Sequence, residues 1–282
     1  MYNYFDNKLL NFIERNLHQS LFLTAIIGGF LVRWLFSQFV TGILHPDEIY
    51  QSLEMAHVMV YDSGIIPPEF KLENRQVESY ATSRSWIFPL IFATIMRFGE
   101  YIGLDYHSGI IPMIYFILVL NSTFMIYSAS KFSFMLTKSK NVQLYTAYAI
   151  AFWFRFVEYT IRSFNNTFFF PILFYGLYRV LLVMERKKVT AYDSFIVMFA
   201  LGVTTYVRLD LLFLVLLVFL VTFNKVNYNQ YIKLAMDGFV GWIIGILTDF
   251  YYYEEYVIVP YKWFLFNIIE SNSDLFGVTP LQ

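Results

Sequence analysis

The sequence predicts an all-α polytopic membrane protein, and two features of its composition point to this class. The chain has 282 residues, of which 58% are hydrophobic and only 15% are charged, whereas about 25% of residues are charged in ordinary soluble domains. So many apolar side chains do not fit into one water-soluble core. A net charge of −1 with high hydrophobicity also argues against a disordered chain and against nucleic-acid binding through a basic surface.

The apolar stretches predict about eight transmembrane helices in one membrane domain over residues 1–282. A bilayer core of roughly 30 Å requires about 20 apolar helical residues. Suitable stretches lie near residues 21–40, 86–103, 108–129, 142–160, 166–184, 192–207, 209–223 and 233–249. Lysines and arginines near 131–140 and 186–188 indicate cytoplasmic loops. With a cytoplasmic N-terminus, the three spans predicted before the loop at 131–140 would place that loop outside. It is cytoplasmic only if one segment between 86 and 130 does not cross or if a further span is added.

Two polar stretches interrupt this pattern, at residues 41–84 and 250–282. We expect them on the face opposite the cytoplasmic loops, and we expect the extramembrane chemistry to reside in them. The first begins L-H-P-D-E-I-Y-Q-S-L-E, and a proline at a first helical position favours a short amphipathic helix along the membrane surface.

In such a helix Asp47, Gln51 and Glu54 share one face, because residues three and four apart are neighbours. A carboxylate at the apolar boundary is poorly solvated, which suits a general base. The alternative interpretation is a helix start that carries solvated acids.

Several polar groups lie at the ends of expected spans. Arg84 precedes Trp86 and is either an interfacial anchor or a phosphate ligand, since guanidinium binds anionic oxygens in a fork. Arg162 and Asn165 lie between two spans; Asn165 begins an N-N-T glycosylation sequon but is better explained as a buried hydrogen-bonding residue. Arg208 and Asp210 either pair with each other or form part of a functional site.

Four other arginines are embedded in apolar sequence, and their long stems allow the charge to reach an interface. They are Arg33, Arg97, Arg155 and Arg179. The chain has no cysteine and its four histidines are dispersed, so we expect no metal site. No nucleotide-binding glycine loop is visible, and we expect no organic cofactor.

Several motifs, in order, resemble a known family. They are H-P-D-E-I-Y-Q-S-L-E, S-R-S-W-I-F-P, T-I-R-S-F-N-N, V-R-L-D, D-F-Y-Y-Y and F-G-V-T-P-L. The order is similar to that of the lipid-linked mannosyltransferases that build glycosylphosphatidylinositol anchors and the dolichol-linked N-glycan precursor. The first motif looks most like the glycosylphosphatidylinositol branch, and the resemblance covers residues 30 to 282.

The resemblance implies a GT-C type membrane glycosyltransferase fold whose first luminal loop, residues 41–84, contributes to the active site. It implies an inverting transfer from a polyprenyl-phosphate mannose donor to a glycolipid acceptor, without a metal or nucleotide sugar. Asp47 matches the candidate general base, with Glu48 as the alternate. The residues implied for the donor phosphate are Arg84, Arg162 and Arg208, and those implied for sugar or acceptor binding are Gln51, Glu54, Asn165 and Asn267.

The chain departs from the family pattern at two places. It has I-P-P-E-F from Ile66 where relatives usually carry a Trp-Glu pair. Relatives also continue through further spans, so we expect a C-terminal truncation relative to the family. The alternatives are a fragment, a natural minimal form, or half of a split enzyme that acts with a partner subunit. The expected membrane is the endoplasmic reticulum in a eukaryotic host, and otherwise a plasma membrane with the site outside the cytoplasm.

Two other functions compete with the enzyme. One is a non-catalytic membrane subunit or decayed relative that binds a lipid-linked sugar. The other is a transporter of lipid-linked sugars, although the pseudo-symmetric halves and broken helices typical of transporters are not visible in the sequence.

Overall fold

The computed structural model describes residues 2–39, 46–72, 81–186, 190–222 and 228–270, and in these ranges the regular structure is helical, without a strand. The helices in chain order are α1 (Tyr2–Phe39), α2 (Glu54–Tyr61), α3 (Ile87–Tyr101), α4 (Ile111–Thr137), α5 (Lys140–Phe152), α6 (Phe154–Thr160), α7 (Asn165–Phe168), α8 (Phe170–Arg186), α9 (Met198–Val207), α10 (Leu212–Thr222), α11 (Tyr228–Tyr253) and α12 (Val259–Phe264). The predicted all-α membrane class is confirmed.

Four helical segments among the described residues are long and apolar enough to cross a membrane. They are Asn16–Phe39, Tyr106–Thr137, Asn165–Arg186 and Tyr228–Tyr253. They coincide with four of the eight predicted stretches. Two shorter apolar helices, Phe195–Val207 and Leu209–Leu220, coincide with two more. The stretch 142–160 is divided into α5 and α6, because the backbone of Trp153 between them is extended.

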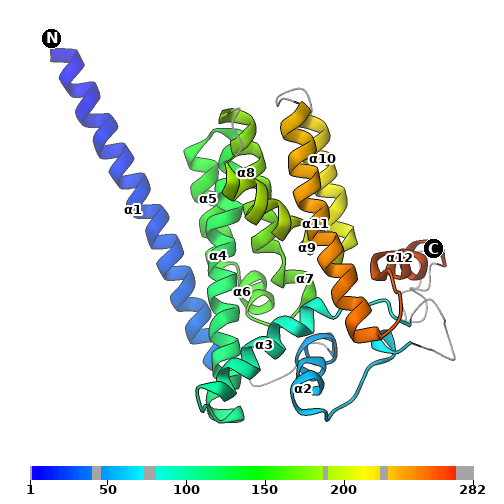
Figure 1. Ribbon diagram of the computed structural model, residues 1–282. Coiled ribbons are helices and arrows are strands. Elements are labelled where there is room, and N and C mark those ends of the chain that lie inside the picture. Colours follow the sequence, from blue (N-terminus) through cyan, green and yellow to red (C-terminus); the bar gives the residue numbers. More distant parts are fainter. Residues whose placement is uncertain (1, 40–45, 73–80, 187–189, 223–227, 271–282) are drawn as a thin grey trace, which may run out of the picture.

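The predicted span at 86–103 is wrong. This stretch forms α3, whose 15 residues measure only about 22 Å at 1.5 Å per residue, less than the thickness of the bilayer core. Figure 1 shows α3 lying obliquely near the end of the bundle farthest from the N-terminus. This segment between 86 and 130 is therefore the one that does not cross, and the first loop and the lysine-rich end of α4 fall on opposite faces.

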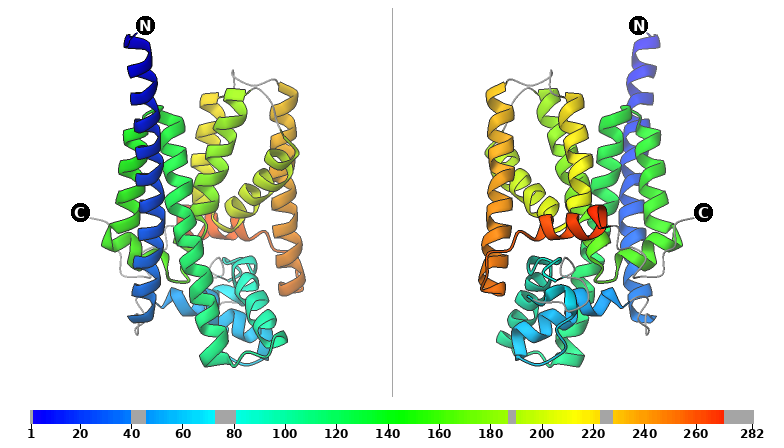
Figure 2. Two further views of the ribbon diagram at one scale, coloured as in Figure 1. Left: turned by 90° about the vertical axis from the view of Figure 1, so that its left-hand side faces the viewer. Right: turned by 90° about the vertical axis from the view of Figure 1, so that its right-hand side faces the viewer.

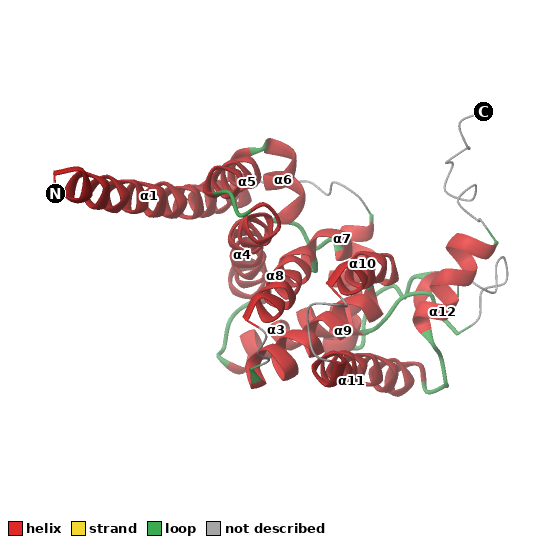
Figure 3. Ribbon diagram, turned by 90° about the horizontal axis from the view of Figure 1, so that it is seen from above, coloured by secondary structure: helices red, strands yellow, loops and turns green. Residues whose placement is uncertain are grey.

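The long helices form a bundle in which many of the closest contacts join helices that are not consecutive in sequence. α1 packs against α4 and α5, α4 against α8, and α9 against both α8 and α11, an arrangement that Figures 2 and 3 show from the side and from above. α9 and α11 approach backbone to backbone at Gly202, Gly238 and Gly241, where an added Cβ on Gly202 would collide with the carbonyl of Gly238. Small residues allow such close contacts between membrane helices.

Arg33 does not reach an interface, contrary to the expectation from its sequence. Its side chain is fully buried between α1, α4 and α5. The guanidinium donates to the carbonyl oxygens of Ile150 and Ala151 at 2.7 and 2.8 Å and to the hydroxyl of Ser122 at 2.5 Å. The two carbonyls belong to the last turn of α5, where helical partners are missing. Arg33 therefore caps a helix inside the bundle.

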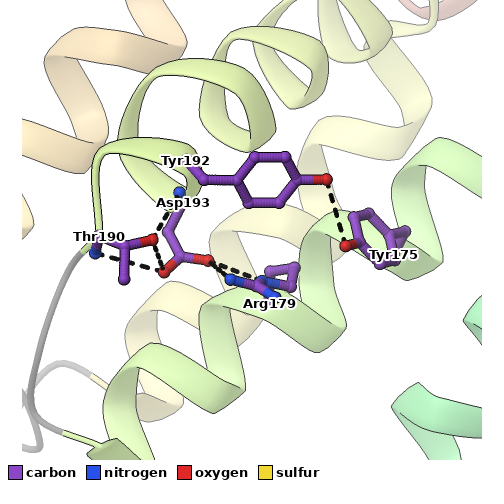
Figure 4. A network of polar contacts seen from close by, with 5 residues as sticks. All are labelled: Tyr175, Arg179, Thr190, Tyr192 and Asp193. Atoms are coloured by element: carbon purple, nitrogen blue, oxygen red, sulfur yellow. Dashed lines mark hydrogen bonds and ion pairs between the residues drawn. The ribbon is translucent and has the colours of Figure 1, made fainter.

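Arg179 forms a second polar anchor, between α8 and the turn that precedes α9. Figure 4 shows its guanidinium against the carboxylate of Asp193, to which Nε donates at 2.6 Å. The hydroxyl of Thr190 donates to the same carboxylate at 2.6 Å, and Tyr192 lies over the guanidinium while its hydroxyl contacts that of Tyr175. The role of this cluster is to hold α8 against the start of α9.

We predict that Arg33→Met destabilises the fold, because Met fills the space but leaves the carbonyls of Ile150 and Ala151 without their donor. Hydrogen bonds to charged groups contribute on the order of 1.5–3 kcal/mol each, so we expect a loss of about 3 kcal/mol. Thermal unfolding of purified protein in detergent measures it. The control is Arg155→Met, whose side chain is largely exposed; equal melting temperatures for the two variants would contradict the capping role.

Candidate active site

A buried ion pair connects the first loop to the segment between α6 and α7. Pro46 starts a helical turn, and its carbonyl oxygen accepts from the amides of Ile49 and Tyr50 at 3.0 Å. Glu48, in this turn, is only 3% exposed, and Arg162 donates to its carboxylate at 2.8 Å. The low dielectric of such a site strengthens the attraction between the two charges. Ser52 and Ser163 donate to the Glu48 carbonyl oxygen at 2.6 Å each and hold the same junction.

Asp47 and Glu48 differ sharply in environment although they are adjacent. The Glu48 carboxylate is enclosed and binds Arg162, whereas Asp47 is half-buried at the start of the helical turn. A general base must come within hydrogen-bond reach of the proton that it removes. The exposed part of Asp47 makes it the more accessible acid of the pair.

The predicted common face of Asp47, Gln51 and Glu54 is wrong. Residues Ile49–Leu53 form a π-helical turn, and the wider turn changes the positions that share a face. Gln51 is buried and donates to Glu69 at 3.3 Å, whereas Glu54 faces the next loop and accepts from the amide of Ile65 at 2.8 Å.

Arg84 has a buried donor that is available to a ligand. Within the described ranges its Nε atom is buried and has no hydrogen-bond partner. Its backbone is held from the other side, because the hydroxyl of Tyr253 donates to the Arg84 carbonyl oxygen at 2.6 Å. Unsatisfied buried donors are rare and call for an explanation; a bound anion supplies one.

Asp249 fixes the segment that carries Arg84. This carboxylate, in α11, is 0% exposed and accepts from the Ser85 hydroxyl at 3.0 Å and the Trp86 amide at 2.8 Å. On its other oxygen it accepts from the Tyr206 hydroxyl at 2.7 Å. The Trp86 ring also stacks on Tyr252, with centroids 5.2 Å apart. Asp249 thus holds the start of α3 between α9 and α11.

The sequence analysis assigned no role to Asp249 or Tyr206, although one signal was present. An acid in an apolar 26-residue helix is costly and marks a functional or structural site. Its partners Ser85 and Trp86 are about 160 positions away in sequence, and no periodicity predicts such a pairing.

Arg208 lies at the end of α9 and its guanidinium is largely occupied. Its Nε and Nη2 atoms donate to the two carboxylate oxygens of Asp210 at 2.8 and 2.5 Å, and its Nη1 atom donates to the side-chain oxygen of Asn166. The predicted alternative of an Arg208–Asp210 pair is confirmed. Neighbouring Asn165 is buried, and among the described residues its Oδ1 atom has no hydrogen-bond partner.

The contacts place most of the predicted residues in one region. Glu48 binds Arg162, and Asn166, which follows Asn165, binds Arg208. Tyr206, two positions before Arg208, donates to Asp249, and Asp249 accepts from Ser85 beside Arg84. Asn267 is different: it is exposed and donates to the Trp263 carbonyl oxygen one turn earlier in its own helix. His45 and residues 271–282, with the F-G-V-T-P-L motif, lie outside the described residues.

A comparison with known protein families finds a match over most of the chain. Residues 25–282 match the Alg9-like mannosyltransferase family. The chain belongs to this family. It is therefore a membrane glycosyltransferase of the GT-C type and a mannosyltransferase, as the motifs predicted. No curated protein and no solved structure matches the chain. Within the described part of the chain, no three acidic or histidine side chains are grouped as metal ligands.

We predict that Asp249→Ala and Asp249→Asn differ strongly. The alanine leaves the donors of Ser85, Trp86 and Tyr206 without an acceptor, at a cost of about 1–3 kcal/mol for each buried group. The asparagine keeps one oxygen for Ser85 and Trp86, and its amide donates to the Tyr206 oxygen. Melting temperature and mannosyl transfer measure both variants. Equal loss in the two variants would show that the charge, and not the hydrogen-bond geometry, holds the Arg84 segment.

Proposed function

We propose that this mannosyltransferase moves mannose from a polyprenyl phosphate, such as dolichyl phosphate, to a hydroxyl group of a glycolipid acceptor. The observation that carries the proposal is the buried, unsatisfied Nε atom of Arg84 in the region that also contains Asp47 and the Glu48–Arg162 pair. A permanent cation with a free donor suits an anionic leaving group. The first-loop motif supports a glycosylphosphatidylinositol precursor as the acceptor.

The reaction balances with the groups of the chain and the two substrates alone. The acceptor oxygen attacks the anomeric carbon from the face opposite the carrier phosphate, and the carbon–oxygen bond to the phosphate breaks. The electron pair leaves with the phosphate, and the acceptor proton passes to a carboxylate. The product is a mannoside of inverted configuration and a free polyprenyl phosphate.

Asp47 is the proposed base. It is the accessible acid of the pair, whereas Glu48 is enclosed by Arg162 and the serine contacts. Removing a proton from the acceptor hydroxyl is general base catalysis, which contributes about 10²–10⁴-fold. Glu48 then has a positioning role, because it fixes the guanidinium of Arg162 and the backbone beside Asp47.

The three arginines share the proposed task of stabilising the leaving phosphate. Charge on the phosphate grows as the bond breaks, so fixed cations lower the barrier. Arg84 is the first contact, since Arg162 is bound to Glu48 and Arg208 to Asp210. The proposed sugar and acceptor ligands are Gln51, Glu54, Asn165 and Asn267. Asn165 is favoured among them by its buried, unsatisfied oxygen.

The orientation of the bundle in the membrane indicates the compartment in which the proposed reaction takes place. Lys138 ends α4, and Arg186 lies in the last turn of α8, and positive residues favour the cytoplasmic side. The active site then opens to the lumen of the endoplasmic reticulum in a eukaryote, or outside the plasma membrane in other hosts.

The decisive experiment supplies purified protein with radiolabelled polyprenyl-phosphate mannose and a panel of glycolipid acceptors. We predict that Asp47→Asn unfolds at the temperature of the unchanged protein but transfers mannose about 10²–10⁴-fold more slowly. The control is Asp62→Asn, an exposed residue in a left-handed conformation that asparagine tolerates. Full activity of Asp47→Asn would remove Asp47 as the base.

Arg84→Gln tests the proposed phosphate ligand separately. We expect at least a tenfold rise in the KM for the lipid-phosphate donor together with a lower kcat, because the lost cation acts on both the bound and the leaving phosphate. Arg84→Lys keeps the charge and should recover part of the activity, whereas the exposed Arg97→Gln should behave as the unchanged protein. An unaltered donor KM in Arg84→Gln would exclude this role.

A further inference from the structure

A pocket lies against the first-loop helices, and its lining includes Ile49, two positions after the proposed base. It has a volume of about 390 Å³, within the range of about 300–1,000 Å³ typical of small-molecule sites. The lining residues are Ile49, Leu53, Glu54, His57, Ser63, Gly64 and Tyr106. Of these, only Glu54 belongs to the set of sugar ligands proposed above. We propose that this pocket binds a neutral saccharide unit of the acceptor, the one next to the sugar that receives mannose.

The aromatic walls fit the apolar face of a sugar ring. The rings of His57 and Tyr106 lie edge to face with centroids 5.5 Å apart, and Tyr61 supports both from behind at 4.6 and 5.8 Å. These mutual contacts fix the rings before a ligand arrives, which lowers the entropy cost of binding. A sugar presents C–H groups on one face and hydroxyl groups at its edge, so it needs such a rigid apolar wall with polar groups at the rim.

The polar rim consists mainly of acceptors. The carboxylate of Glu54 uses Oε1 to accept from the Ile65 amide, which leaves Oε2 for a ligand. His57 contacts the Ser63 carbonyl oxygen through Nδ1 at 2.8 Å. Since a carbonyl only accepts, Nδ1 carries the hydrogen, and neutral His57 presents Nε2 as a further acceptor. Hydroxyl groups of a sugar are suitable donors for both atoms.

The charge of the pocket excludes phosphate as the favoured ligand. Among the described residues, its lining contains one carboxylate and no lysine or arginine, and an acid repels an anion in a partly enclosed site. The donor phosphate therefore belongs with Arg84, and the pocket is left for an uncharged ligand.

Gly64 gives the rim its shape. Its φ of +140° is a conformation that other residues rarely adopt, and an added Cβ would lie 2.8 Å from both Glu54 Oε1 and Val58 Cγ2. The glycine therefore allows the loop at 63–65 to close on Glu54 and His57. This closure forms one wall of the pocket.

The distance from the proposed base gives the pocket its place in the reaction. Asp47 and Glu54 are seven positions apart on one continuous helical stretch. An acceptor glycan with its reacting hydroxyl at Asp47 thus extends its preceding sugar toward the pocket. This inference rests on the proposed function, and it makes acceptor length the quantity to measure.

The test compares two synthetic glycolipid acceptors that carry one mannose or two. We expect His57→Ala and Glu54→Gln to lower the ratio of kcat/KM for the two-mannose acceptor to that for the one-mannose acceptor at least tenfold. The donor KM should not change. Glu54→Gln keeps an oxygen for the Ile65 amide, so the loop stays closed. The matched control is His18→Ala, a histidine of α1 that contacts the Lys140 carbonyl oxygen and lies outside the pocket lining, which should leave the ratio as it is.

A variant that only damages the structure loses activity with both acceptors, and the ratio of their kcat/KM values does not change. An unchanged ratio in an active enzyme therefore contradicts the proposed saccharide site but not the proposed transferase. If the unchanged protein transfers no mannose, the proposed function fails, and binding is measured directly. Saturation-transfer NMR with a free mannose disaccharide should then show binding that His57→Ala reduces at least tenfold and His18→Ala does not. No saturation with the unchanged protein overturns the pocket.

Discussion

The arrangement of the candidate site depends on the buried pair of Glu48 and Arg162. Two charges taken out of water are stable only if each meets the other in good geometry and the remaining polar atoms are also satisfied. Here the 2.8 Å contact between the side chains is accompanied by two serine hydroxyls on the Glu48 carbonyl. These requirements leave little freedom for the first turn after Pro46. Asp47 is held in place because its neighbour is immobile, although it is itself more exposed.

A second set of contacts, centred on the Asp249 carboxylate, fixes the backbone that carries Arg84. Asp249 accepts hydrogen bonds from α3 and α9, and the hydroxyl of Tyr253 holds the Arg84 backbone. The two anchors come from opposite parts of the chain, so the cations that face the proposed leaving group are fixed independently. Such preorganisation means that the protein does not reorganise when charge develops. Arg208 is the exception, because Asp210 competes for its guanidinium with any anion that binds.

Hydropathy predicted much of the fold, because α1, α4, α8 and α11 combine sufficient length with apolar sequence. It failed at α3, which is apolar but too short to cross. The ordered motifs predicted the family, and the phosphate-binding role that they imply for Arg84, Arg162 and Arg208 stays a prediction. Helical spacing failed for Gln51 and Glu54, since a π-helical turn is a local distortion without a periodic signature. The contacts of Arg33 with Ser122 and Ala151 and that of Asp249 with Ser85 join residues more than 80 positions apart in sequence, and only the folded chain brings them together.

The glycine contact between α9 and α11 has a mechanical consequence. Where backbones touch, no flexible side chain absorbs a relative displacement, so the two helices move as one rigid body near Gly202 and Gly241. Gly245 extends this contact by making room for the Tyr206 ring, whose hydroxyl reaches Asp249 on the same helix. A tilt of this helix pair in the bilayer is therefore transmitted to Ser85 and Trp86 without slack, and the mobility of the segment that carries Arg84 is coupled to the surrounding lipid.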